Sequence, residues 1–270
     1  MRGPDRAGSL PLTLPPERPV AQRVPQNVPK ITAKWHSHRL QKEVLCVRYG
    51  SGGLPVLLYP TAGGDAEESE RFWMISVLGD LLGAGKVRVY TVDSAAGKVW
   101  TDGESTGAHR AWYQNRFDDF IVSEMVPLIR KDTGNPKAEI VSAGASLGAF
   151  MALASVCRHP ELFKSAICMS GTYDFTRWMN KEHTVDFHYA SPQHFLPSMP
   201  EGETLDKLRT RFILLATGNG DYEAPEESWL IAKLLGAKGI PNRVDIWEGY
   251  RHDWTTWREM LPKYLTELTK

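Results

Sequence analysis

The chain predicts an α/β protein with a mainly parallel central sheet, helices on both faces and an insertion that covers the site. From residue 31 onward, short apolar segments of strand length alternate with amphipathic stretches of helical spacing. This alternation is typical of strands buried between two layers of helices. Residues 172–210 interrupt it and are rich in aromatic side chains. An insertion of this length usually covers or lines a site; an irregular surface segment with its own small core is the alternative.

The strands and helices follow from the hydrophobic period. Expected strands are Ile31–His36, Glu43–Tyr49, Pro55–Tyr59, Val87–Val92, Glu139–Ser142, Ser165–Met169, Arg211–Ala216 and Arg243–Trp247, the first two as an antiparallel pair. Expected helices are Glu70–Leu82, Ala108–Lys131 with an interruption before Pro127, Ala149–Ala154, Glu226–Leu235 and Thr255–Thr269.

The first 29 residues differ in composition from the rest. They contain Pro4, Pro11, Pro15, Pro16, Pro19, Pro25 and Pro29. Proline excludes both a helix and a central strand here. We expect residues 1–29 to form an extended arm that docks through Leu10, Leu12, Leu14 and Val20, with a disordered tail as the alternative. Residues 30–270 are expected to form one domain.

Charge and cysteine content limit the functional classes. The chain has 32 Lys and Arg residues and 32 Asp and Glu residues, so its formal net charge is zero. The overall charge therefore gives no attraction to nucleic acid or to a membrane surface. No apolar run approaches the roughly 18 residues of a membrane span, and no signal peptide is evident. Cys46, Cys157 and Cys168 lack metal-like spacing, and the latter two are expected as buried thiols. We expect a cytoplasmic protein; the oligomeric state is not indicated.

The segment Gly144-Ala145-Ser146-Leu147-Gly148 reads G-x-S-x-G between a predicted strand and a predicted helix. A serine at the apex of such a turn has a strained backbone, so small neighbours are needed for strand and helix to pass closely. The free N–H groups of the following helix favour a developing oxyanion. Ser146 is therefore the candidate nucleophile.

A serine nucleophile needs a base, usually a histidine oriented by a carboxylate. On this strand–turn–helix arrangement the chain order is Ser, acid, His. His252 follows the last predicted strand and precedes the last helix, where the base belongs. In the loop 217–225, position favours Asp221 as the acid, and Glu223 is equally able to reach. The second oxyanion donor, beside the amide of Leu147, is assigned to Thr61 or Ala62.

Several segments resemble the branch of the α/β hydrolases that contains esterase D, enterochelin esterase and the mycolyltransferase antigens. They are Pro60-Thr61-Ala62-Gly63-Gly64, Gly144–Gly148, Ser170-Gly171-Thr172-Tyr173-Asp174, Gly218-x-Gly220-x-Tyr222-Glu223 and His252-Asp253-Trp254-Thr255-Thr256-Trp257. The resemblance covers about residue 40 to the end and implies an α/β-hydrolase fold. It also implies a serine esterase without metal or organic cofactor, and it favours Glu223 over Asp221. Unlike many α/β hydrolases, this chain has no His-Gly after the third strand.

The expected activity is hydrolysis of a small or medium ester through an acyl-enzyme. An acyltransferase with the same triad, and a hydrolase-like protein that only binds a partner, are the alternatives. Candidate substrate-binding residues are Trp254, which follows the base, and the aromatic residues Trp178, Phe187 and Tyr189 of the insertion. Trp254 and Trp257 share a helix face, so packing of the last helix is the alternative for both.

Overall fold

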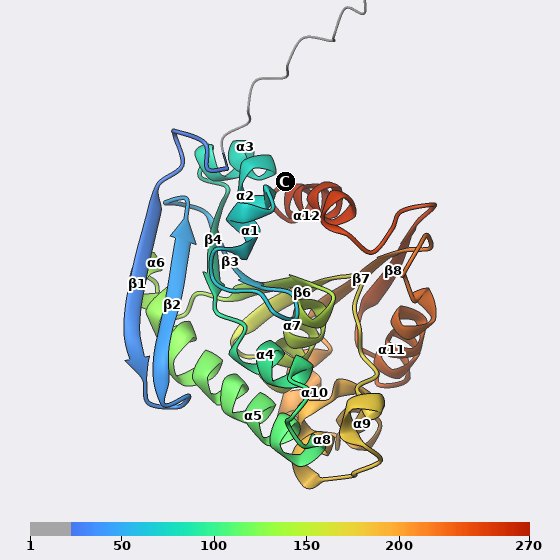
Figure 1. Ribbon diagram of the computed structural model, residues 1–270. Coiled ribbons are helices and arrows are strands. Elements are labelled where there is room, and N and C mark those ends of the chain that lie inside the picture. The colour runs from blue at the N-terminus through green and yellow to red at the C-terminus, as the bar shows by residue number, and fades with distance from the viewer. Residues whose placement is uncertain (1–22) are drawn as a thin grey trace, which may run out of the picture.

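The computed structural model describes residues 23–270. A single eight-stranded sheet forms the centre of this part of the chain (Figure 1). Its strands are β1 (Lys30–Ser37), β2 (Lys42–Tyr49), β3 (Leu54–Tyr59), β4 (Val87–Val92), β5 (Ile140–Ala145), β6 (Phe163–Met169), β7 (Phe212–Gly218) and β8 (Asn242–Trp247). Every strand expected from the sequence is present, with ends displaced by three residues at most.

The strand order is β1-β2-β4-β3-β5-β6-β7-β8. β1 pairs antiparallel with β2, and β2 pairs antiparallel with β4, whereas all other neighbours are parallel. The predicted opening pair and the mainly parallel sheet are thus confirmed. Because parallel strands point the same way, β3, β5, β6, β7 and β8 end at one edge, where ligand sites of α/β sheets form.

Helices cover both faces of the sheet. They are α1 (Glu68–Arg71), α2 (Met74–Val77), α3 (Gly79–Gly83), α4 (Ala95–Thr101), α5 (Gly107–Phe120), α6 (Val126–Thr133), α7 (Leu147–Arg158), α8 (Val185–Ala190), α9 (Pro192–Ser198), α10 (Glu203–Leu208), α11 (Pro225–Ala237) and α12 (Trp254–Leu268). Helices α2, α3 and α12 pack on one face, and α5, α6, α7 and α11 pack on the other. Figure 1 shows α12 beside α1 and α2, with α5 and α8 on the opposite side.

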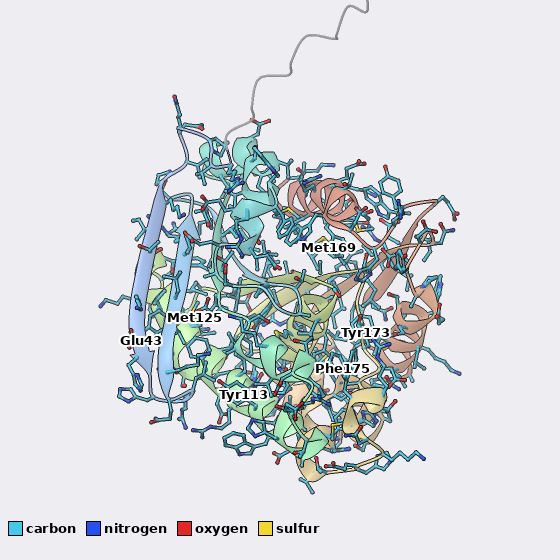
Figure 2. The ribbon with its side chains drawn as sticks, in the orientation of Figure 1. Glu43, Tyr113, Met125, Met169, Tyr173 and Phe175 are labelled. Atoms are coloured by element: carbon cyan, nitrogen blue, oxygen red, sulfur yellow. The ribbon has the colours of Figure 1, made fainter. Side chains whose placement is uncertain are left out.

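Two apolar clusters fill the space between the sheet and its helices. One includes Phe117, Met125, Phe150 and Phe175; the other includes Met169. Figure 2 shows Met125, Met169 and Phe175 inside the molecule, whereas Glu43 lies at the outer strand pair. Helix α7 is buried along almost its whole length, since it lies between the sheet and the inserted helices.

The single helix expected over Glu70–Leu82 is wrong. The structure contains three short helices there, α1 to α3, and Trp73 between the first two has a left-handed φ of 65°. A residue with this φ ends a right-handed helix, because the helical hydrogen-bond ladder cannot continue through it. The apolar residues keep a helical spacing across all three short helices. The spacing alone therefore predicted one continuous helix.

The interruption before Pro127 is confirmed. Helix α5 passes through a π-helical turn, η1 (Ile121–Met125), into α6, where Pro127 occupies the first turn. Proline has no N–H to donate, so the carbonyl one turn earlier loses its helical partner, and a wider turn accommodates this break in the hydrogen-bond ladder. Helix α4 was not predicted, because its sequence AAGKVWT is short and lacks a helical period.

The insertion 172–210 is more regular than a surface loop. It holds the 3₁₀ turn η2 (Thr176–Met179) and the helices α8, α9 and α10, whose Phe187, Leu196 and Leu205 join the core. Of the proposed arm, only residues 23–29 are described. Val28 is buried, and Pro25 lies against Gly79 of α3. The docking residues Leu10, Leu12, Leu14 and Val20 lie outside the described residues.

No helix within residues 23–270 combines the length and apolarity that a membrane span requires. Cys46, Cys157 and Cys168 are all buried and unpaired, as expected for two of them. Burial raises the pKa of the Cys46 and Cys168 thiols to about 12 and that of Cys157 still further.

We expect none of these thiols to react in the folded protein, because the thiolate is the reactive form and neither access nor ionisation is available. A disulfide reagent such as dithionitrobenzoate at pH 8 should give no rapid reaction with native protein and three thiols per chain in guanidinium. Rapid release of thionitrobenzoate before unfolding would contradict the buried positions.

Candidate active site

Ser146 lies at the turn between β5 and α7, with φ 56° and ψ −122°. This conformation is strained for a residue with a side chain. Two hydrogen bonds from the neighbouring strand end hold it: Ser146 N donates to Met169 O at 2.9 Å, and Thr172 N donates to Ser146 O at 3.4 Å. The hydroxyl is therefore presented at the carboxyl edge of the sheet, at the N-terminus of a 12-residue helix.

Glycine is required on both sides of Ser146. A Cβ at Gly144 would overlap the main chain of Gly148, and a Cβ at Gly148 would lie 2.6 Å from Pro60 O. The main chains of strand β5, helix α7 and the loop after β3 are therefore in direct contact, with no side chain between them. The predicted reason for small residues at these positions is confirmed.

His252 is within hydrogen-bond distance of Ser146. Its Nε2 lies 3.0 Å from Ser146 Oγ, and its Nδ1 lies 3.5 Å from Oε2 of Glu223. The Glu223 side chain is 1% exposed, whereas that of His252 is 23% exposed. The His252 side chain therefore contacts solvent, while the Glu223 side chain behind it does not.

Glu223 is held by hydroxyl groups on two strand ends. Ser170 Oγ donates to Oε1 at 2.5 Å, and Thr217 Oγ1 donates to Oε2 at 3.1 Å. Burial raises the pKa of the Glu223 carboxyl, but contacts with His252, Ser170 and Thr217 outweigh this and hold it below its usual value. Glu223 therefore stays ionised, as an orienting carboxylate must.

Asp221 lies elsewhere. Its side chain is 69% exposed and pairs with Arg251 at 3.1 Å. Only its main-chain carbonyl is near the base, where it accepts a hydrogen bond from His252 N at 3.1 Å. Of the two acids considered from the sequence, the structure brings Glu223 to His252, in agreement with the resemblance and against the argument from position.

Sequence reasoning assigned no role to Ser170, Thr217 or Trp257 in holding the acid. Trp257 Nε1 donates to Ser170 Oγ at 2.9 Å, and its ring meets the His252 ring edge-on at 5.2 Å. Ser170 has a left-handed φ of 46°. Ser170-Gly171 and Trp257 both lie in segments that resemble the esterase branch of the α/β hydrolases, so the sequence did mark these positions. Their hydrogen bonds could not be predicted, because hydroxyl and indole groups leave no periodic pattern in the sequence.

The loop after β3 lies beside the nucleophile turn. Tyr59 pairs with Gly144 in the parallel register, so Pro60 and Thr61 leave the sheet next to Ala145 and Ser146. The amide of Leu147 is at the first position of α7 and has no partner within its own helix. Loop and helix start together form the candidate oxyanion hole.

A sequence model of the family Esterase, described as "Putative esterase", matches residues 89–268. The match includes Ser146, Glu223 and His252 and covers more than half of the chain. The chain belongs to this esterase family. Its fold is that of the α/β hydrolases, which the solved structures reported below share.

One curated relative of the esterase is an endo-1,4-beta-xylanase/feruloyl esterase of Xylanibacter ruminicola, 26% identical over 224 residues. The match covers 80% of this chain but spans only 26% of that relative's length. A solved ferulic acid esterase has a TM-score of 0.70 at 16% identity, covering 90% of this chain and 98% of its own. An S-formylglutathione hydrolase from Agrobacterium tumefaciens gives 0.69 at 12% identity, covering 93% and 98%. These two structures show the shared fold.

The first turn of α12 carries Trp254, two residues after His252 in the chain. Asp253 caps this helix by accepting a hydrogen bond from Thr256 N at 3.1 Å. Trp254 stacks face to face on Phe72, with 4.8 Å between ring centres and 2° between planes, and meets Trp257 edge-on. Phe72 is 42% exposed. Trp254 therefore packs in part and also contributes to an aromatic surface two residues from His252.

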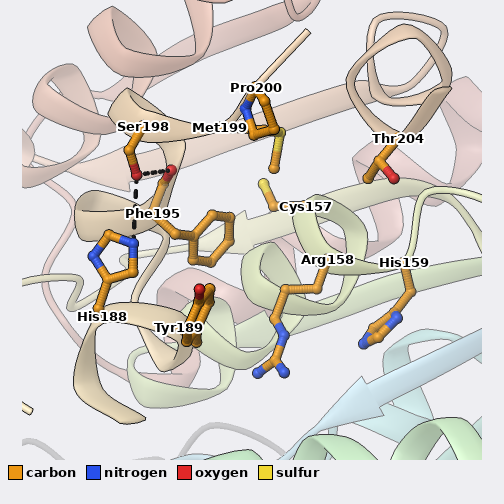
Figure 3. A pocket seen from close by; sticks show the side chains of 10 residues that line it. All are labelled: Cys157, Arg158, His159, His188, Tyr189, Phe195, Ser198, Met199, Pro200 and Thr204. Atoms are coloured by element: carbon orange, nitrogen blue, oxygen red, sulfur yellow. Dashed lines mark hydrogen bonds between the residues drawn. The ribbon is translucent and has the colours of Figure 1, made fainter. Parts of the chain in front are cut away.

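The aromatic residues of the insertion lie in other surroundings. Phe187 is buried against Trp100, and Trp178 packs on Phe175. Tyr189 lines a cavity of about 410 Å³ with Cys157, Arg158 and Phe195 (Figure 3). This cavity is at the last turn of α7, whereas Ser146 precedes its first, and a helix of 12 residues is about 18 Å long. Within residues 23–270, no hydrogen bond or ring contact links these three residues to Ser146 or His252.

Among the described residues, no three His, Cys, Asp or Glu side chains gather as a metal site would require.

We expect Gly144→Ala to lower the free energy of unfolding by about 1–3 kcal/mol, because the added methyl group forces main chain apart. Gly236→Ala is the matched control: Gly236 lies near the end of α11, with nothing within 4 Å of a Cβ there. That change should stabilise the protein by about 0.5–1 kcal/mol. Guanidinium unfolding followed by tryptophan fluorescence measures both, and equal stabilities of Gly144→Ala and wild type would contradict the close approach.

Proposed function

We propose that the esterase hydrolyses small or medium carboxylic esters through an acyl-enzyme on Ser146, with His252 as base and Glu223 as the orienting acid. The observation that carries the proposal is the continuous chain of contacts from Ser146 Oγ to His252 Nε2, and from His252 Nδ1 to Glu223. This order of groups is what activates a serine hydroxyl.

In the first half of the reaction, Ser146 Oγ forms a bond to the ester carbonyl carbon while its proton passes to His252 Nε2. Amides of the Leu147 turn and of the loop after β3 bind the resulting oxyanion. The tetrahedral intermediate collapses, the bond to the alcohol oxygen breaks, and His252 returns the proton to that oxygen. The acyl group remains on Ser146, and the alcohol leaves.

In the second half, water takes the place of the alcohol. His252 accepts a proton from water as the water oxygen attacks the acyl carbon and forms a second tetrahedral intermediate. The bond between the acyl carbon and Ser146 Oγ then breaks, and His252 returns the proton to Ser146 Oγ. Glu223 stays ionised throughout and stabilises the charge on His252. The acid product leaves, and no cofactor takes part.

The exposure of His252 favours water, rather than a second alcohol, as the acceptor of the acyl group. The His252 side chain is 23% exposed, so solvent reaches the side chain that must activate the second nucleophile. Acyl transfer would need a site from which water is excluded. The stacked Phe72 and Trp254 offer an aromatic face near His252, and the names of the relatives supply the first substrates to test: methyl ferulate and S-formylglutathione.

The triad is tested with a series of short and medium acyl nitrophenyl esters. Ser146→Ala and His252→Ala should lower kcat/KM by about 10⁴-fold or more, and Glu223→Gln by about 10³- to 10⁴-fold.

Asp221→Asn is the matched control for Glu223→Gln. Because its exposed ion pair with Arg251 contributes little, kcat/KM should stay within about fivefold of wild type. Full activity of Ser146→Ala would refute the nucleophile, and a larger loss from Asp221→Asn than from Glu223→Gln would reverse the choice of acid.

Hydrolysis and transfer are separated by product analysis with methanol added to the reaction. A hydrolase should give mainly the free acid, with methyl ester rising only in proportion to methanol concentration. Preferential formation of the methyl ester at low methanol would instead favour the acyltransferase. Chromatography of the acyl products gives the ratio directly.

A further inference from the structure

The loop Pro60–Gly64 leaves the sheet beside Ser146, and the main-chain carbonyls of Thr61 and Ala62 at its tip both accept hydrogen bonds. Thr61 O accepts a hydrogen bond from Gly64 N at 3.2 Å, and Ala62 O accepts one from Ser94 Oγ at 3.4 Å. The first hydrogen bond lies within the loop, and the second comes from Ser94, the residue that precedes α4. They fix two successive peptide planes, and with them the directions of their N–H groups.

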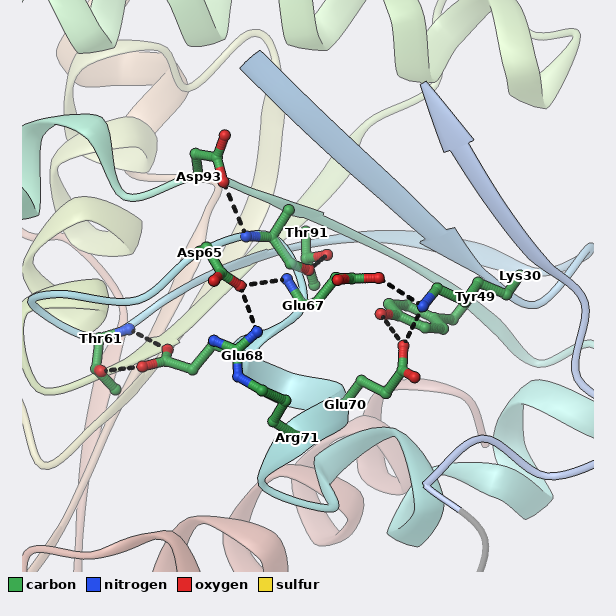
Figure 4. Close-up of polar contacts among 11 residues, drawn as sticks. Lys30, Tyr49, Thr61, Asp65, Glu67, Glu68, Glu70, Arg71, Thr91 and Asp93 are labelled. Carbon is green, nitrogen blue, oxygen red and sulfur yellow. Dashed lines mark hydrogen bonds and ion pairs between the residues drawn. The ribbon is translucent and has the colours of Figure 1, made fainter. Parts of the chain in front are cut away.

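Glu68 fixes the remaining groups of Thr61. Its Oε2 accepts a hydrogen bond from Thr61 N at 2.8 Å, and its Oε1 accepts one from Thr61 Oγ1 at 2.6 Å (Figure 4). The residue is 6% exposed. Gly64 gives the carboxyl group its space, because a Cβ there would overlap it. A buried carboxylate that accepts two hydrogen bonds from one residue is a strong local restraint.

These contacts distinguish the two candidate donors. The amide of Thr61 is directed at a carboxylate, so it is unavailable to an oxyanion, which the same carboxylate would also repel. Ala62 N, in contrast, donates no hydrogen bond within residues 23–270. Since Thr61 O is turned toward Gly64, the Ala62 N–H of the same trans peptide points the other way.

We propose that Glu68 is a positioning residue of the esterase: it holds Thr61 so that the Ala62 amide, with that of Leu147, binds the oxyanion. The inference rests on the proposed function. Pro60 O lies against Gly148, so the loop held by Glu68 is packed directly on the start of α7, next to the Leu147 amide. Glu68 does not touch the substrate and acts through Thr61.

The variants follow from the contacts. Glu68→Ala removes both hydrogen bonds to Thr61. Glu68→Gln keeps the shape, since its amide oxygen still accepts from Thr61 N and its amide nitrogen donates to Thr61 Oγ1. Thr61→Val removes only the hydroxyl contact and leaves the loop occupied. Glu67→Ala is the control, because Glu67 is the adjacent residue in sequence but pairs outward with Lys30.

Two readouts separate positioning from general stability. The first is the rate at which a fluorophosphonate labels Ser146, because its phosphoryl oxygen needs the same donors as an ester oxyanion. The second is the split between kcat and KM for a nitrophenyl ester. Thermal melts identify variants that remain folded at the assay temperature.

Glu68→Ala should label about 10- to 100-fold more slowly and lose kcat by a similar factor, with KM within about threefold of wild type. Thr61→Val should fall between Glu68→Ala and wild type. Glu68→Gln and Glu67→Ala should stay within about fivefold of wild type, given the contacts they retain. If Glu68→Ala does not fold, the test is the comparison of the other two variants. The proposal then requires that Thr61→Val be labelled more slowly than Glu68→Gln.

Labelling of Glu68→Ala and Thr61→Val at the wild-type rate would overturn the role of Glu68 while leaving Ser146 as nucleophile. So would a loss that appears in KM alone. Absence of labelling at Ser146 in folded wild type would overturn the proposed function, and the assignment of Glu68 with it. The two failures are therefore distinguishable in one set of measurements.

Discussion

The close approach of three main-chain segments at Gly144, Gly148 and Pro60 is the constraint on which the rest of the site depends. It allows α7 to begin directly over the end of β5, which leaves Ser146 at the apex with a strained φ of 56°. The parallel register of β3 and β5 then brings the loop after β3 alongside. Ser146 and the amides of the candidate oxyanion hole thus have fixed relative positions in the folded chain.

The remaining groups of the site are arranged around this turn by strand ends. Ser170 follows β6, Thr217 is in β7, and Glu223 follows β7, so adjacent parallel strands supply the acid and its hydrogen-bond donors. His252 follows β8 and is braced by Trp257 on α12. A carboxylate buried in this manner remains charged only because each oxygen is hydrogen-bonded, and it transmits that negative potential to the histidine.

Much of the fold, and the meeting of Ser146 with His252 in the candidate site, could be predicted from the sequence. Each strand could be predicted because it is a short apolar run. Chain order predicted that Ser146 and His252 lie together, and the structure places them 3.0 Å apart. The breaks near Trp73 were missed because a left-handed residue leaves the apolar period unchanged. The contacts of Glu68 with Thr61 and of Ser170 with Glu223 were not predicted, because the hydroxyl of Ser170 and the carboxyl of Glu223 are distant in sequence and neither contact follows a periodic pattern. The choice between Glu223 and Asp221 needed the direction of each side chain, which spacing alone does not give.

The central claim, that ester hydrolysis passes through an acyl group on Ser146, is tested most directly with a nitrophenyl carbamate. Its carbamoyl group is transferred by the same steps but is released slowly. Mass spectrometry of the treated protein should find one carbamoyl group per chain on the peptide that contains Ser146, and esterase activity should fall in proportion to labelling. Loss of activity with the group on another residue, or full activity with Ser146 labelled, would contradict the account.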